Sequence, residues 1–131
     1  MFTKNRTLII AEAGVNHNGD IATAEALIDA ASYAGADVVK FQMFKADKLA
    51  TAEAQKTRYQ LAQNPDITGQ LELLSALELN PDQHIHLFKY AQTKNIEFLS
   101  SGFDKESNDF LVSIGISRVK IPSGEINNLP F

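Results

Sequence analysis

Polar side chains that could hold a small anion follow short apolar runs at several places along the chain. At one of them, Lys120 lies among alternating apolar residues, and Pro122 and Gly124 come directly after it. Proline cannot donate to a sheet ladder and glycine frees the backbone, so we predict a strand that stops and turns there. Lys120 then meets the hydroxyl of Ser123 and the carboxylate of Glu125 at one strand end. Taken alone, the stretch also fits a solvated turn whose lysine reaches into water.

Three earlier segments end in the same way. An apolar run at 7–11 predicts a strand buried on both faces, and it ends at Glu12. A second strand at 37–42 places Lys40 and Gln42 on one face, and a third at 96–100 is followed by Ser101. A lysine inside an apolar strand is costly unless its ammonium meets an anion or reaches water. We expect an anion; the alternative is an edge strand from which Lys40 points to solvent.

Helices alternate with these strands and must position the polar residues. Asp20, Asn80 and Asp104 each precede an amphipathic stretch and predict helix N-termini. With a fourth strand at 116–121, the pattern is α/β with about four βα units. Right-handed crossovers leave two architectures, an open doubly wound sheet or part of a (β/α)₈ barrel. Ligands bind at the carboxyl ends of the strands in both.

A long polar connection, residues 43–66, follows the second strand and includes Asn64. A connection of this length is uncommon in a compact domain and is often a binding loop. We expect it to lie over the same strand ends as Lys40.

Composition limits the function. The chain has 131 residues, 44% of them hydrophobic, which suits one domain with a core. Its net charge of −4 argues against a nucleic-acid or anionic-membrane binder. We see no membrane span or signal segment and expect a soluble, cytoplasmic protein without disulfides, since cysteine is absent.

The three histidines do not predict a metal site. His84 and His86 are two residues apart on a predicted helix and point to nearly opposite sides. His17 lies in a glycine-rich loop, where hydrogen bonding or solvation is the expectation. We predict no complete metal site in this chain.

Two lysines and serine hydroxyls at one strand mouth suit a phosphate or a carboxylate. Glu12, Gln42 and Glu125 suit a polyhydroxylated partner. No Gly-x-Gly-x-x-Gly sequence follows the first strand and no Walker-type Gly-Lys-Ser/Thr occurs, so dinucleotide and P-loop functions are weakly supported. The residues therefore point to a small anionic metabolite and a sugar.

Four segments, in order, together resemble the sialic acid synthase family, which includes N-acetylneuraminate, legionaminate and spore-coat polysaccharide synthases. They are IAEAGVNHNG at 10–19, VKFQ at 39–42, FLSSGFD at 98–104 and KIPSGEINN at 120–128. The resemblance implies the first half of a TIM (β/α)₈ barrel. It also implies condensation of phosphoenolpyruvate with an N-acetylated mannosamine-type sugar and water, giving a nonulosonic acid and phosphate with a divalent metal, Mn²⁺ or Mg²⁺.

The resemblance also assigns roles by position. The residues matching those that hold phosphoenolpyruvate are Lys40, Ser101, Lys120 and Ser123; those matching the sugar-facing residues are Glu12, Gln42 and Glu125, with Asn64 matching more loosely. The two lysines would neutralise the trianionic substrate, and Glu125 would take or return a proton as water adds. Ser101 stands where the family often has threonine, and Gly102 where it often has proline.

The family's barrel continues past residue 131, its metal-binding histidines lie on later strands, and an antifreeze-like domain usually follows. We therefore expect residues 1–131 to be the N-terminal portion of the synthase barrel, inactive alone. Unpaired sheet edges would make it self-associate, as a homo-oligomer, or belong to a longer protein. The alternative function is a non-catalytic half-barrel module that binds a phosphorylated metabolite or a partner chain.

Overall fold

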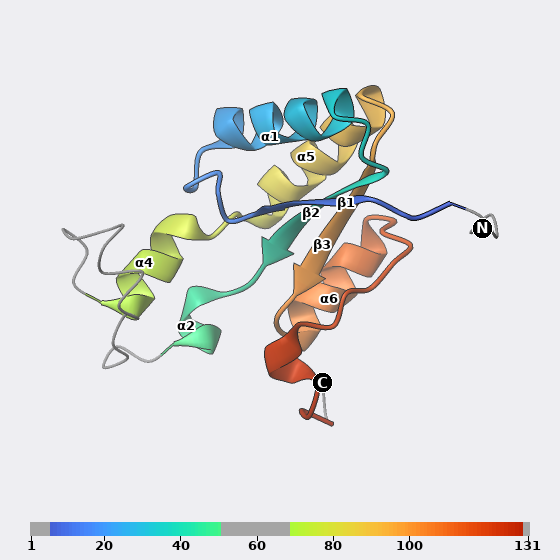
Figure 1. Ribbon diagram of the computed structural model, residues 1–131. Helices are drawn as coiled ribbons and strands as arrows, with labels where there is room; N and C mark the ends of the chain where they lie inside the picture. The colour runs from blue at the N-terminus through green and yellow to red at the C-terminus, as the bar shows by residue number, and fades with distance from the viewer. Residues whose placement is uncertain (1–5, 51–68, 130–131) are drawn as a thin grey trace.

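The computed structural model describes residues 6–50 and 69–129. Three parallel strands form one sheet in the order β1 (Ile10–Gly14), β2 (Val38–Met43) and β3 (Glu97–Gly102). Helices connect successive strands, and α1 and α5 lie side by side over one face of the sheet (Figure 1). The predicted α/β class with parallel strands is confirmed for the described residues.

Three helices, α1, α5 and α6, begin directly after the predicted caps Asp20, Asn80 and Asp104. The Asp20 carboxylate accepts from the Thr23 backbone N–H at 2.7 Å. Asn80 and Gln83 form a reciprocal capping box, and the Asp104 carboxylate accepts from the Ser107 N–H at 2.9 Å. The described helices are α1 (Ile21–Tyr33), α2 (Ala46–Leu49), α4 (Gln70–Leu77), α5 (Pro81–Thr93), α6 (Lys105–Ser113) and the 3₁₀ turn η1 (Ser123–Glu125).

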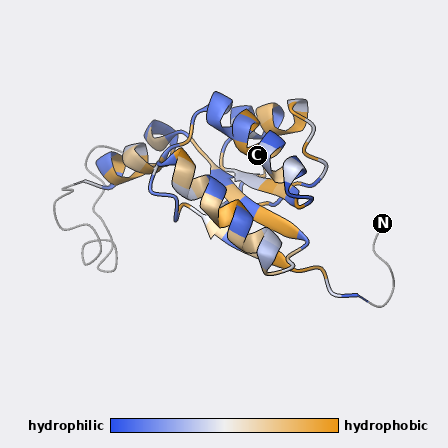
Figure 2. Ribbon diagram, turned by 90° about the horizontal axis from the view of Figure 1, so that it is seen from above, coloured by the Kyte–Doolittle hydropathy of each residue, from blue (hydrophilic) through white to orange (hydrophobic). Residues whose placement is uncertain are grey.

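The hydrophobic core lies between the sheet and the helices. Phe41 of β2 stacks on Phe98 of β3 with ring centroids 5.4 Å apart, and Phe88 of α5 meets Phe98 edge-on. Ile28 of α1 and Leu87 of α5 are completely buried. Figure 2 shows hydrophobic residues gathered along the strands, while the helices carry both kinds of residue. This packing fixes one face of the sheet against helices.

The prediction for the first strand is wrong in its bounds and burial. β1 begins at Ile10 and continues through Glu12 to Gly14, whereas 7–11 was expected. Ile9 and Ile10 are 51% and 43% exposed, because helices cover only one face of the sheet here. β2, in contrast, is the central strand, which rules out the edge-strand alternative for Lys40.

The predicted fourth strand is absent. Residues 116–122 form no strand in the described structure, and Val119 and Ile121 are 62% and 50% exposed. Alternating apolar residues form a strand only where a neighbouring strand accepts their hydrogen bonds and a facing layer buries one side. This segment has neither in the described residues. It is anchored at its start, where the Arg118 Nε lies 2.5 Å from the Glu97 carboxylate.

The long connection after β2 is joined at its base. Its first residues form α2, and Glu78, which follows α4, contacts them. The Glu78 carboxylate accepts from Lys45 Nζ at 2.7 Å and from the Ala46 N–H at 2.9 Å. Asn64 lies outside the described residues. No helix in the described ranges combines the length and apolar character that crossing a membrane requires.

Candidate active site

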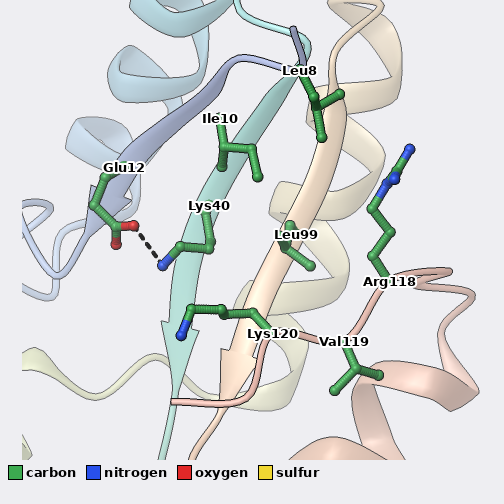
Figure 3. Close-up of a pocket in the computed structure, with 8 residues that line it drawn as sticks. All are labelled: Leu8, Ile10, Glu12, Lys40, Leu99, Arg118, Val119 and Lys120. Atoms are coloured by element: carbon green, nitrogen blue, oxygen red, sulfur yellow. Dashed lines mark ion pairs between the residues drawn. The ribbon is translucent and has the colours of Figure 1, made fainter. Parts of the chain in front are cut away.

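Side chains alternate between the two faces of the sheet, and one set of them lies on the face that the helices do not cover. In the strand register, Glu12 of β1 pairs with Lys40 of β2, and Lys40 pairs with Leu99 of β3. All three side chains border a pocket of about 550 Å³ (Figure 3). The residues that line it are Leu8, Ile10, Glu12, Lys40, Leu99, Arg118, Val119 and Lys120. The pocket extends along the face of the sheet, beyond the strand ends at which the sequence predicted the site.

Lys40 is the charged centre of this pocket. Its side chain is 13% exposed, and its Nζ lies 2.5 Å from the Glu12 carboxylate, which is 51% exposed (Figure 3). A nearly buried ammonium needs an anionic partner, because losing its hydration without one is costly. The predicted requirement for an anion beside Lys40 is met here by a side chain of the same molecule.

Gly14 makes room for the polar groups beside this pair. The strand register shifts between Glu12 and Gly14, and Gly14 has φ +56°. A Cβ atom on Gly14 would lie 3.2 Å from the Glu12 Oε1 and 3.5 Å from the Gln42 Nε2. The Glu12 carboxylate and Gln42 amide therefore occupy the same small region, beside the Lys40 ammonium. Three of the predicted site residues are thus brought together.

Lys120 borders the same pocket from the segment after α6. Its Nζ donates to the carbonyl of Ile121 at 2.5 Å, so its ammonium has no carboxylate partner among the described contacts. Lys40 and Lys120 thus line one pocket, although Lys120 comes from an irregular segment in place of a strand, and their roles in binding stay predictions.

Neighbouring serines of β3 face opposite sides. Ser101 pairs in register with Gln42, so alternation puts it on the side of Lys40 and Gln42, and it is 3% exposed. Ser100 pairs with Phe41 and lies on the helix side, where its Oγ is 3.5 Å from the His84 Nε2. Only Ser101 has the orientation that a ligand-binding role requires.

Ser123 and Glu125 lie in η1, beyond Lys120. Ser123 is exposed, and the Glu125 carboxylate accepts from the Asn128 side-chain amide at 2.7 Å. Neither residue lines the pocket around Lys40. Their roles stay predictions.

Two histidines beneath the strand ends are completely buried, which the sequence reasoning did not foresee. The His17 Nδ1 accepts from the Gly19 N–H at 3.0 Å. Of the two expectations for His17, hydrogen bonding is therefore confirmed, and exposure to solvent is wrong because the ring is buried. Burial lowers the pKa of His17, and it lowers the pKa of His84 to about 4. The spacing of His84 at i, i+3 and i+7 with Leu87 and Ala91 was the available signal for its burial.

The described residues do not form a complete metal site. No group of three or more histidine and acidic side chains comes together within the described ranges. His84 is buried whereas His86 is exposed and pairs with Glu25 at 2.5 Å, so the two rings point apart as expected. Within residues 6–50 and 69–129, Glu12 is the one acid that lines the pocket, and it is already paired with Lys40. These donors do not fit a divalent ion, and no chemical step is assigned to one.

The fold of this chain is similar to that of solved structures. An N-acetylneuraminic acid (sialic acid) synthetase from Leptospira borgpetersenii, crystallised with citrate, matches 99% of this chain and 43% of its own, with TM-score 0.78 and 28% identity. The spore coat polysaccharide biosynthesis protein SpsE from Bacillus subtilis matches 99% of this chain and 35% of its own, with TM-score 0.68 and 38% identity. The fold is therefore that of the first part of a (β/α)₈ barrel, and the open doubly wound sheet is excluded.

Sequence comparison gives the same result. An N,N'-diacetyllegionaminic acid synthase from Legionella pneumophila is 53% identical over 123 residues, which cover 94% of this chain and 35% of the relative. The chain thus spans about a third of the length of such relatives. The NeuB family pattern matches residues 27–131. The chain belongs to the NeuB family.

Proposed function

We propose that this chain supplies the phosphoenolpyruvate-binding part of a nonulosonic acid synthase. The enzyme would join phosphoenolpyruvate to an N-acetylmannosamine-type sugar with water and release phosphate, in the cytoplasm and with Mn²⁺ or Mg²⁺ bound by residues outside those described. The observation that carries the proposal is the convergence of Lys40 and Lys120 on one pocket, in a chain similar to named legionaminic and sialic acid synthases.

The pocket chemistry is consistent with an anionic substrate. Lys40 and Lys120 supply two positive charges from different segments, as binding of a phosphate and a carboxylate in one molecule requires. Ser101 adds a hydroxyl on the same face by alternation. The Gln42 amide and the Glu12 carboxylate, held beside Gly14, are suited to sugar hydroxyl groups.

The proposed reaction forms a carbon–carbon bond between the enol carbon of phosphoenolpyruvate and the sugar aldehyde. Water then adds at the oxocarbenium centre and phosphate leaves. The chain's own contribution is to hold the anion with Lys40 and Lys120 while negative charge redistributes. Glu125 is our candidate for the group that exchanges a proton with the attacking water, on the basis of its position in the sequence motif.

A chimaera tests the proposal. This chain replaces the matching 123 residues of the Legionella relative, so that the rest of a longer synthase is present. Phosphate release from phosphoenolpyruvate is followed with Mn²⁺ and the sugar substrate of that relative. We expect turnover, and we expect Lys40→Ala and Lys120→Ala to lower kcat/KM for phosphoenolpyruvate by about 100-fold or more, as loss of one charge-stabilising donor does in other active sites. Glu125→Gln should lower kcat at saturating substrate.

Lys89→Ala on the exposed side of α5 is the matched control, since it removes the same charge and should leave kcat/KM unchanged. A folded chimaera without turnover, or one in which Lys40→Ala and Lys120→Ala remain fully active, would contradict the proposal. A folded, inactive chimaera that still binds phosphoenolpyruvate would favour the alternative, a non-catalytic module for a phosphorylated metabolite.

A further inference from the structure

The ion pair between Glu12 and Lys40 occupies the position where an anionic ligand would bind. Lys40 belongs to the central strand and its side chain is 13% exposed, so its ammonium has little contact with water. Among the ion pairs of the described residues, its partner is Glu12, directly across the strand pair in register. The charge of Lys40 is therefore neutralised by a side chain of the same molecule.

Glu12 and Lys40 differ in how much hydration each regains when the ion pair separates. Glu12 is 51% exposed and lies on an outer strand of the described sheet, so its carboxylate regains hydration when it leaves the pair. Lys40 regains less hydration, because its side chain is only 13% exposed. An incoming phosphate or carboxylate can replace Glu12 on Lys40 at small cost, whereas an uncharged ligand would leave the ammonium without a partner.

The space around Gly14 bears on the same exchange. The Glu12 Oε1 and the Gln42 Nε2 both lie within 3.5 Å of where a Cβ on Gly14 would be. A carboxylate released from Lys40 remains beside this amide, with lone pairs open to hydroxyl donors. Loss of the internal ion pair thus produces a hydroxyl-binding pair next to the occupied anion site.

We propose that Glu12 is an internal counter-ion of Lys40 that an anionic ligand displaces, and that its displacement turns Glu12 into an acceptor for the hydroxyl groups of a second ligand. The inference rests on the proposed function, in that the anion site is taken to serve phosphoenolpyruvate. It adds selection for anions to that site, because a ligand must compete with the Glu12 carboxylate for Lys40.

The test is an NMR titration of the 131-residue chain with inorganic phosphate and, separately, phosphoenolpyruvate, at constant pH and ionic strength. The Gln42 side-chain amide reports binding. Glu12→Gln keeps the shape of the side chain and removes its charge, so we expect it to bind either anion about three- to fivefold more tightly than the wild type, the upper part of the range expected from removal of one competing, partly exposed ion pair. In the wild type, the Glu12 carboxyl ¹³C resonance should shift as the anion binds.

Glu25→Gln is the matched control. Glu25 belongs to α1, on the helix side of the sheet, and pairs with His86, so this change removes equal charge without freeing a cation that lines the pocket. Its affinity for the anions should stay within twofold of the wild type. Equal tightening in both variants would indicate a general field effect and overturn the exchange, as would unchanged or weaker binding in Glu12→Gln.

Different results would overturn the anion site and the exchange of Glu12. If neither the wild type nor Glu12→Gln binds phosphate or phosphoenolpyruvate, the pocket is not an anion site and both the proposed function of Lys40 and the exchange are overturned. If both proteins bind with equal affinity and the Glu12 resonance does not move, the anion site stands and the exchange alone is overturned.

Discussion

His84 brings a titratable ring into the core directly below the candidate site. Its Nδ1 lies 3.2 Å from the Asn80 carbonyl and its Nε2 lies 3.5 Å from the Ser100 hydroxyl. The ring also meets Phe98 edge-on at 6.5 Å. Because these surroundings offer no anion within the described contacts, the neutral ring is the stable form. One residue thereby links the start of α5 to the end of β3.

The unfolding free energy should depend on the protonation of His84. The pKa is about 4 in the folded chain against 6.5 when unperturbed. The contribution of neutral His84 to the unfolding free energy is therefore fully present above pH 6.5. It is lost as the pH falls toward 4, which lowers the unfolding free energy by about 3 kcal/mol. Urea unfolding at pH 7 and pH 4.5 measures the decline, and His84→Leu should reduce it.

Leu87→Val provides the control for that comparison. Leu87 is buried on the same helix, so the substitution lowers stability without removing a titrating group. It should keep the decline of the wild type between the two pH values. The same decline in His84→Leu would show that other groups cause the acid sensitivity.

At the scale of elements, caps were predictable and strand limits were not. Asp20, Asn80 and Asp104 act through hydrogen bonds to residues three positions away, so the information is local. The limits of β1 and the absence of a strand at 116–121 depend on which distant segments lie alongside. Val119 and Lys120 both line the pocket although they are neighbours in the chain, so the alternating pattern did not give their directions, and no local pattern specifies a missing neighbouring strand.

The loop between β1 and α1 depends on a close approach that no sequence pattern shows. Gly19 has φ +76°, and a Cβ there would lie 2.3 Å from the Ala76 carbonyl oxygen of α4. The Gly19 N–H also donates to His17. The glycine therefore lets the loop that follows Glu12 rest directly on the backbone of α4.

Gly19→Ala should destabilise the chain more than Gly35→Ala. Gly35 has the same φ of +76° but no atom within 4 Å of its added Cβ. Gly35→Ala thus measures the cost of the left-handed conformation alone, about 1 kcal/mol. Gly19→Ala adds a backbone displacement, for which we expect about 1–3 kcal/mol more. Urea unfolding of the two variants gives the difference, and equal losses would exclude the close packing of Gly19 on α4.

At the scale of the whole molecule, helices cover one face of the sheet, and the other borders a pocket lined by apolar as well as charged residues. Side chains alternate between the two faces along each strand, so the sequence predicted that Lys40 and Gln42 share a face. The four motifs that resemble the sialic acid synthase family predicted the barrel. The position of Ser123 and Glu125 relative to the pocket was not predictable, because it depends on how an irregular segment lies over the sheet.

Within the described residues, β1 and β3 each pair with β2 only, so each has an outer edge that no strand covers. We expect the 131-residue chain to self-associate through these edges as its concentration rises. Light scattering after size exclusion, over a range of loading concentrations, measures the association. Ile9→Lys, directly before β1, should weaken it by placing a charge at the edge.

Tyr33→Lys is the control for this experiment, because Tyr33 is 96% exposed at the end of α1, away from the edges of the sheet. It should leave the association unchanged. A monomer at all concentrations would contradict the prediction, and equal weakening by both lysines would assign the association to general hydrophobic exposure.

The contacts of Glu78 have a consequence for redesign of the chain. Glu78 directly follows α4 and joins the end of that helix to Lys45 and Ala46 at the start of α2. Doubling the length of a chain segment between two points joined in this way costs only about 0.6 kcal/mol in closure entropy. A change in the length of the chain between α2 and α4 should therefore leave intact the register of β2 and β3, the strands that carry Lys40 and Ser101.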